Sequence, residues 1–196
     1  KTKVLTSRIA HIIKQKKAYP NQVLAVTFTN KAAKEMRERL QISSAVGHLV
    51  HVGTFHSACM RWLREFSGEL GFSADFTIYD DKDSLQVLKK ILKDFKLSSE
   101  LPPAKEYQRL ISQLKTYGLL PHESQTYAQR NPKSIIPFGV EVYDLYQQEL
   151  INCNAMDFSD LLLNMLLLLR KNKKVKNTLQ ARYQHILIDK YQDTNG

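Results

Sequence analysis

The first residues that could do chemistry are Lys1 and Thr2, which directly precede a segment (3–17) with apolar residues at helical spacing. In a phosphate-binding loop, a lysine neutralises the β- and γ-phosphates of a nucleotide and a threonine hydroxyl coordinates Mg²⁺. The start of the following helix then receives phosphate. The glycines that cradle phosphate in such a loop are not among these residues, so the dipeptide alone is weak evidence for a nucleotide site.

A second candidate is Asp189, which follows the apolar run 185–188. Sheets of α/β proteins place ligand chemistry at the carboxyl ends of their strands. In phosphoryl transfer, an acid at this position holds Mg²⁺, and a neighbouring carboxylate can orient the attacking water. The alternative is a strand that runs into an ordinary Asp-Asn turn, and the strand considered alone favours that alternative.

The elements that would position these residues are predicted from the hydrophobic pattern. Compact β-branched runs predict strands over 23–29, 50–55 and 185–189. Helices are expected over 3–17, over the segment capped by Thr29 or Asn30, and over 57–66. Strands that alternate with helices predict an α/β fold with a parallel sheet.

The middle of the chain lacks this alternation. Helices are expected over 81–95, around 107–114 with Gly118 closing the helix, over 140–152, and over 157–171 with Asp157 as its cap. The sequence therefore predicts a helical insert between the second and third strands.

Charge follows the same partition. The formal net charge is +10 for the whole chain, +8 for residues 1–60, −3 for 61–160 and +5 for 161–196. Basic ends suit a polyanion such as nucleic acid, although a solvated basic face is an equally simple explanation.

Composition narrows the class of protein. Hydrophobic residues make up 43% of the chain and charged residues 24%, which is typical of a globular protein and excludes disorder. The two cysteines have no metal-ligand spacing and are expected to be reduced thiols. With no signal-peptide pattern and no run long enough to span a bilayer, an intracellular protein without a membrane partner is expected.

Five ordered motifs together resemble the N-terminal half of a superfamily 1 DNA helicase of the UvrD/Rep/PcrA type. Lys1-Thr2 is similar to the end of motif I, and Ile188 begins a segment similar to motif II. The others are TFTNKAA at 27–33 (motif Ia), TFH at 54–56 (motif Ib) and MDFSDLL at 156–162 (the family's Asp-Phe segment). The resemblance covers essentially all 196 residues.

The resemblance implies a RecA-like P-loop NTPase sheet, subdomain 1A, formed by residues 1–71 and 178–196. Residues 72–177 would be the inserted all-helical subdomain 1B. It also implies ATP and Mg²⁺ as cofactors, and 3′–5′ translocation on single-stranded DNA and at single-strand/duplex junctions in repair or replication. A second RecA-like domain would supply an arginine finger and would be the partner of this half.

The resemblance also assigns site residues. Lys1 and Thr2 would bind the nucleotide, Thr2 and Asp189 would hold Mg²⁺, and Asp189 and Gln192 would be catalytic. Lys190 occupies the position where the family has the catalytic glutamate, so the general-base role is not carried to this residue. This fragment is therefore expected not to hydrolyse ATP.

For DNA, the positions similar to family contacts are Phe28, Asn30, Lys31 and His56. An aromatic ring at the end of a strand can stack on an unpaired base without reading sequence. The alternatives are that Phe28 is a core residue, that His56 is an ordinary surface histidine and that Lys31 is only solvated. The basic segment with Arg170, Lys171, Lys173, Lys174 and Lys176 could contact DNA or could merely keep a leucine-rich helix in solution.

Two rival functions remain at this level. Lys190 favours a nucleic-acid-binding module that does not hydrolyse ATP. The motifs also suit the helicase portion of a recombination helicase–nuclease, which a nuclease domain elsewhere in the natural chain would reveal. The expected location is the cytoplasm, associated with the nucleoid, in a bacterium, and the nucleus or an organelle in a eukaryote.

Overall fold

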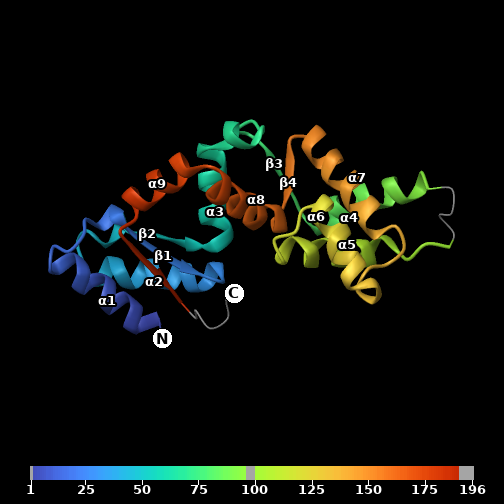
Figure 1. The fold of residues 1–196 in the computed structure, drawn as a ribbon. Helices are drawn as coiled ribbons and strands as arrows, with labels where there is room; N and C mark the ends of the chain where they lie inside the picture. Colours follow the sequence, from blue (N-terminus) through green and yellow to red (C-terminus); the bar gives the residue numbers. More distant parts are fainter. Residues whose placement is uncertain (1, 96–99, 190–196) are drawn as a thin grey trace. The chain divides into compact units, whose positions relative to one another are not determined.

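A computed structural model describes residues 2–95 and 100–189, which form two compact units (Figure 1). Unit 1 comprises Lys1–Arg61 and Leu169–Gly196, and unit 2 comprises Trp62–Leu168. The two boundaries between the units therefore lie ten and nine residues before the boundaries expected from the sequence.

The helices and strands within the described residues are as follows. The α-helices are α1 (Thr2–Lys14), α2 (Asn30–Ser43), α3 (Phe55–Glu65), α4 (Asp81–Lys93), α5 (Ala104–Thr116), α6 (Pro121–Arg130), α7 (Gly139–Asn152), α8 (Phe158–Lys171) and α9 (Lys173–Arg182). The strands are β1 (Val23–Thr27), β2 (His51–Thr54), β3 (Thr77–Tyr79), β4 (Ala155–Asp157) and β5 (His185–Ile188). Short 3₁₀ turns are η1 (Pro20–Gln22), η2 (Gly47–Leu49), η3 (Ser67–Leu70) and η4 (Pro132–Ser134).

Unit 1 contains a parallel sheet of order β2-β1-β5. All five residues of the central strand β1 are buried, as expected for a strand covered on both faces. The predicted α/β fold with parallel pairing is therefore confirmed, and β5 joins the sheet beside β1 although the whole of unit 2 lies between them in sequence.

Helices α1 and α2 lie side by side along this sheet (Figure 1). Helix α1 buries Ile9 and Ile12, and α2 buries Met36 and Leu40 at the spacing of an inward helical face. These side chains share one core with Val23 and Ala25 of β1 and Val52 of β2. This packing fixes the level of α1 against the sheet, and hence the position of Thr2 at its start.

In the part of unit 2 that the structure describes, the regular elements are helices and the three-residue parallel strands β3 and β4, whereas the sequence predicts an all-helical insert. Its core joins α4, α5 and α7 and contains three fully buried tyrosines, Tyr107, Tyr143 and Tyr146. Helix α4 begins with a reciprocal cap in which the Asp80 carboxylate accepts from the Lys82 and Asp83 amides at 2.7 and 2.9 Å. These aspartates therefore stabilise the positive end of α4, as expected.

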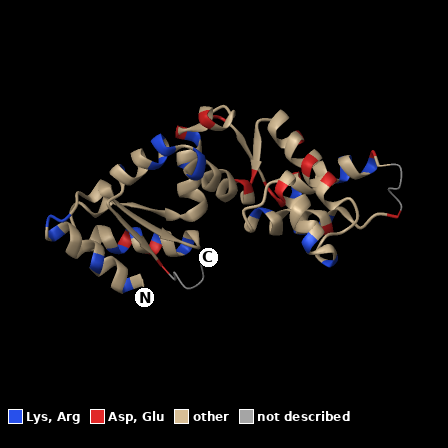
Figure 2. Cartoon of the chain, in the orientation of Figure 1, with Lys and Arg blue, Asp and Glu red and all other residues tan. Residues whose placement is uncertain are grey.

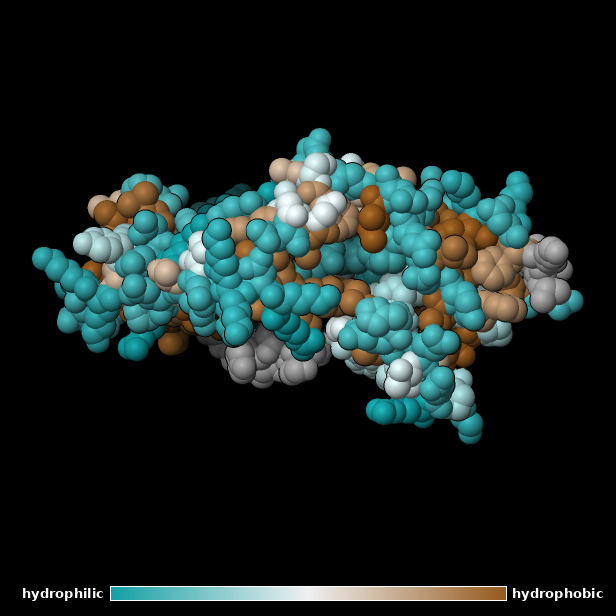
Figure 3. Space-filling model, turned by 45° about the horizontal axis from the view of Figure 1, so that its top comes forward, coloured by the Kyte–Doolittle hydropathy of each residue, from teal (hydrophilic) through white to brown (hydrophobic). Residues whose placement is uncertain are grey.

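The surface is mostly hydrophilic on the face shown in Figure 3, where teal residues surround smaller brown groups. Some apolar side chains are nevertheless exposed, among them Tyr19 on unit 1 and Ile151 on unit 2. Among the described residues, no helix has the length and apolar character that a membrane crossing requires.

Candidate functional site

The carboxyl ends of the three strands of unit 1 meet at one edge of the sheet. Thr27 of β1 lies level with Thr54 of β2, and Val26 lies level with Ile188 of β5. The register continues one residue further, because the Asp189 amide donates to the Val26 carbonyl at 3.0 Å. Residues that immediately follow β1, β2 and β5 are therefore gathered at the edge where α/β proteins hold ligands.

Asp189 and Thr2 come together at this edge. The Thr2 hydroxyl donates to Oδ2 of Asp189 at 3.2 Å, although the two residues stand at opposite ends of the described chain. Asp189 is only 4% exposed, and its Oδ1 atom has no hydrogen-bond partner within 2–95 and 100–189. A buried carboxylate oxygen without a partner is costly unless a cation or a hydrogen-bond donor satisfies it.

The donor set fits a hard cation such as Mg²⁺, which prefers carboxylate and hydroxyl oxygens. The described residues contain no group of three or more His, Cys, Asp or Glu side chains that could hold a metal ion. Mg²⁺ usually keeps several waters and binds phosphate oxygens, so it needs only a few ligands from a protein. Lys1, Lys190 and Gln192, the other nucleotide-site predictions, lie outside the described residues.

The connection between β1 and α2 carries the predicted DNA-contact residue Phe28, and the first turn of α2 carries the other two, Asn30 and Lys31. Phe28 is 44% exposed, which excludes the alternative that it is a core residue. Thr29 caps α2 by accepting from the Ala32 amide at 3.2 Å, so Asn30 and Lys31 are exposed residues of the first helical turn. All three predicted residues are therefore accessible at the site edge of the sheet.

The connection between β2 and α3 places His56 at the same edge. Thr54 and Ser57 bind each other reciprocally: the Thr54 amide donates to Ser57 Oγ at 2.9 Å, and the Ser57 amide donates to Thr54 Oγ1 at 3.2 Å. Burial lowers the pKa of His56 below its ordinary value of 6.5. At neutral pH, His56 is therefore an uncharged hydrogen-bonding group, which differs from a cation that pairs with phosphate.

One residue of this edge was missed by the sequence analysis. Phe55, the first residue of α3, contacts Phe28 with a ring-centroid distance of 5.3 Å and an interplanar angle of 53°. The available signal was an aromatic residue at or near the carboxyl end of each predicted strand. Using that signal would have required the register of β1 and β2, which the sequence does not state.

The basic segment around the end of α8 and the start of α9 belongs to unit 1. Figure 2 shows Lys and Arg positions along α9 and along α1. Arg170, Lys171, Lys173, Lys174 and Lys176 are all exposed. Exposure leaves open both earlier explanations for this segment, DNA contact and solvation.

Unit 2 contains a separate buried charge cluster at the Asp-Phe segment. The Lys115 ammonium, with a fully buried side chain, lies 2.7 Å from Asp157 Oδ2 and 2.8 Å from Asp160 Oδ1. The Tyr146 hydroxyl donates to Asp157 at 3.0 Å, and the Gln147 side-chain amide donates to Asp160 at 3.2 Å. The cluster thus joins α5 and α7 to the start of α8, where Asp157 is the predicted cap.

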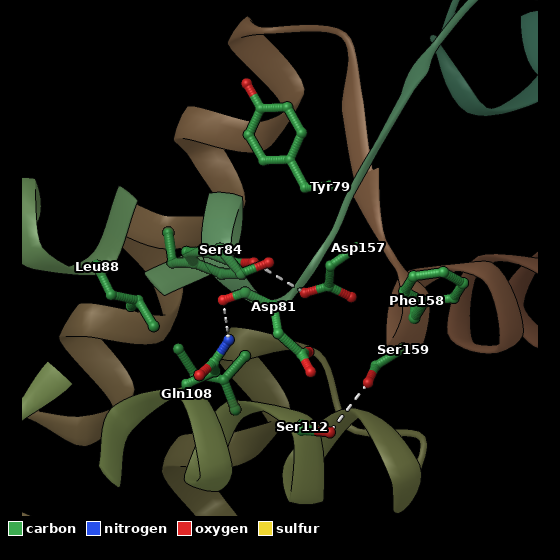
Figure 4. A pocket seen from close by; sticks show the side chains of 11 residues that line it. Tyr79, Asp81, Ser84, Leu88, Gln108, Ser112, Asp157, Phe158 and Ser159 are labelled. Atoms are coloured by element: carbon green, nitrogen blue, oxygen red, sulfur yellow. Dashed lines mark hydrogen bonds between the residues drawn. The ribbon is translucent and has the colours of Figure 1, made fainter. Parts of the chain in front are cut away.

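A pocket with an empty volume of about 350 Å³ lies beside this cluster (Figure 4). Its polar groups bind one another: the Gln108 side-chain amide donates to the Asp81 carbonyl at 2.8 Å, and the Ser112 and Ser159 hydroxyls are 3.0 Å apart. These contacts join α4 to α5 and α5 to α8, and they therefore stabilise the packing of unit 2.

The parallel α/β sheet, with the Thr2–Asp189 pair at the carboxyl ends of its strands, places this chain in the class of RecA-like proteins. A largely helical insert separates β5 from the other two strands of the sheet in sequence. The family model described as the UvrD/REP helicase N-terminal domain matches residues 1–196. The chain belongs to this family.

Curated relatives match the whole chain. A probable DNA helicase II homolog from Rickettsia conorii is 42% identical over 198 residues, and the ATP-dependent DNA helicase PcrA from Staphylococcus aureus is 37% identical over 196 residues. The chain spans 30% and 26% of the lengths of these two relatives.

Proposed function

We propose that this chain is the ATP-binding and single-stranded-DNA-binding half of an ATP-dependent DNA helicase that translocates 3′–5′ in DNA repair or replication. The observation that carries the proposal is the pairing of Thr2 with the buried Asp189, at the same sheet edge as the exposed Phe28. Homology to helicases supplies the class of reaction, and the edge supplies residues suited to a nucleotide and to an unpaired strand.

At the nucleotide site, Thr2 and Asp189 would hold Mg²⁺, and Lys1 would neutralise the β- and γ-phosphates. The metal, when bound, neutralises charge on the phosphate oxygens. The residues of this chain would orient the nucleotide: the start of α1 would offer backbone amides to phosphate, and Oδ1 of Asp189, which has no hydrogen-bond partner among the described residues, would be available as a cation ligand.

Hydrolysis should require more than this chain provides. A second RecA-like domain would have to contribute the arginine that stabilises transition-state charge. In addition, the ammonium of Lys190 carries its proton at neutral pH, since the ordinary lysine pKa is ~10.4, and it cannot accept one from water. The chain should therefore bind without turnover, and Lys190 is the specific feature that favours the second candidate, a non-hydrolysing nucleic-acid-binding module.

Binding by the chain itself tests the first part. Fluorescence anisotropy should show weak, sequence-independent binding of a labelled oligonucleotide, with affinity falling steeply as salt rises. With a fluorescent ATP analogue, Asp189→Asn should reduce Mg²⁺-dependent binding about tenfold or more, whereas Asp94→Asn, at an exposed residue of unit 2, should have no effect. Salt-insensitive DNA binding, or an equal loss in both variants, would contradict the proposal.

Phosphate release by a complete helicase that carries this domain tests the second part. With Lys190 present, DNA-stimulated turnover should stay at background. Changing Lys190→Glu should raise it by roughly 10²–10⁴-fold, the usual contribution of a general base. Equal and robust rates with lysine and glutamate would refute this account of the position.

A further inference from the structure

The rotamer of the exposed Phe28 ring is restricted by a contact from outside its own connection. Phe28 lies in the two-residue link between β1 and α2 and is 44% exposed. An exposed side chain exchanges between rotamers unless a neighbour restricts it. The tilted contact with the Phe55 ring, at a centroid distance of 5.3 Å, is a restriction of this kind.

Phe55 is itself held in place by the turn that begins α3. The reciprocal bonds between Thr54 and Ser57 are completed by a third, in which the Ser57 hydroxyl donates to the Thr54 carbonyl at 2.9 Å. A Cβ at Gly53 would lie 2.6 Å from Ser57 Oγ, so a larger residue there would displace this hydroxyl from its hydrogen bonds. The backbone at Phe55 is therefore fixed by hydrogen bonds on both sides of the residue.

The sheet register then sets the two rings against each other. Thr27 and Thr54 are paired across β1 and β2, and each phenylalanine immediately follows its threonine. The contact is thus a consequence of strand pairing, and it leaves much of Phe28 exposed to a ligand. Phe55 is less exposed than Phe28, so a base in solution has readier access to Phe28.

We infer that Phe55 is a positioning residue that orients Phe28 for stacking on an unpaired base. The inference rests on the proposed function and extends it, because it names the residue that preorganises the aromatic contact. A ring that is already oriented loses less conformational freedom when a base stacks on it, and this increases affinity. The ligand is a base with an accessible face, so a strand that lacks bases cannot benefit from Phe55.

The experiment compares two oligonucleotides of equal length and charge. One is oligo-dT with a single 2-aminopurine, and the other carries abasic residues in place of nucleosides. Phe55→Leu should weaken binding of the first roughly two- to tenfold, the range expected for an aromatic pair, and should reduce the 2-aminopurine fluorescence change. Binding of the abasic strand should be unchanged, and Phe55→Tyr should restore binding of the first.

A double-mutant cycle separates positioning from independent contact. In a Phe28→Ala background, Phe55→Leu should cause no further loss, because there is no ring left to orient. Tyr19→Leu is the matched control, since Tyr19 is a more exposed aromatic at the amino end of β1 and should not affect stacking. If Phe55→Leu lowers the thermal midpoint, Phe55→Met repeats the cycle with an unbranched side chain of similar volume that adapts to the gap.

The outcomes are distinguishable. Equal affinity of wild type for both strands would overturn stacking and this inference, whereas failure of wild type to bind either strand would overturn the DNA part of the proposed function. A loss for Phe28→Ala without a loss for Phe55→Leu would overturn only the inference. The same would follow if Phe55→Leu weakened binding equally with and without Phe28, or weakened binding of the abasic strand.

Discussion

Removing the buried ammonium of Lys115 should destabilise unit 2 more than removing an exposed surface charge would. In Lys115→Met, two carboxylates would lose contacts of 2.7 and 2.8 Å, and the carboxylate of Asp160 is completely buried. Breaking a buried ion pair on one side typically costs about 3–5 kcal/mol, because the remaining charge is left without a partner. The expected decrease in the free energy of unfolding at pH 7 is therefore of that order.

The pH dependence of this loss identifies its cause. Burial already raises the pKa of Asp160 above its ordinary value of 3.8, with Lys115 acting in the opposite direction. Without Lys115, this pKa rises further, so folding of the variant is coupled to proton uptake by Asp160. As pH falls towards the ordinary carboxyl pKa, the unfolded chain is protonated as well, and the difference between variant and wild type should shrink.

Urea unfolding followed by circular dichroism at pH 7 and pH 5 measures both effects. The matched control is Lys90→Met, because Lys90 makes a 3.1 Å ion pair with Glu149 while its side chain is 73% exposed. Exposed pairs contribute about 0–1 kcal/mol, so the control should stay close to wild type. A Lys115→Met variant within ~1 kcal/mol of wild type at pH 7 would refute the reasoning.

Three further outcomes are expected. Burial and nearby guanidinium groups lower the pKa of His51 below 6.5. Because the unfolded chain then binds the proton more readily, the stability of the folded chain should fall as pH drops from 7 to 5. In melting curves recorded across this pH range, His51→Gln should reduce the dependence of stability on pH. Iodoacetamide at pH 8 should label the exposed Cys153 at least ~10²-fold faster than Cys59, because burial raises the pKa of Cys59 to about 12; mass spectrometry of peptides checks this. Gly47→Ala should lower the free energy of unfolding by ~1–3 kcal/mol in urea titrations, because the added Cβ would lie 2.2 Å from a backbone oxygen of α2. Gly68→Ala is the control and should change this free energy by less, because no atom lies within 4 Å of the added Cβ.

The parallel sheet was predictable because its signals are local. Runs of β-branched residues mark the strands, and Thr29 provides a cap that the structure confirms at α2. The acid that directly follows the apolar run 185–188 also identified Asp189 as a candidate site residue. The site role of Thr2, its hydrogen-bond partner, was predicted only from the family resemblance, since no local pattern shows that residues so far apart in sequence will meet.

Other features depend on contacts that the sequence does not encode locally. Helix α9 was not predicted, because it is rich in lysine and buries only Val175 and Leu179. Lys115 looks like an ordinary solvated lysine within an amphipathic helix, and its burial follows only from the two aspartates that reach it from the start of α8. The strands β3 and β4 are too short to give an alternating pattern.

The pairing of β5 with β1 has a consequence for the order in which the chain can fold during synthesis. Unit 2 is one continuous stretch, so all of its described contacts are available once Leu168 has left the ribosome. The sheet of unit 1 can gain its third strand only after His185, the pairing partner of Val23, has been synthesised. Because Asp189 directly follows that strand, the carboxylate is the last described group to arrive. A ribosome-bound chain that ends before β5 should therefore carry a folded insert and an exposed edge on β1 where another strand could bind.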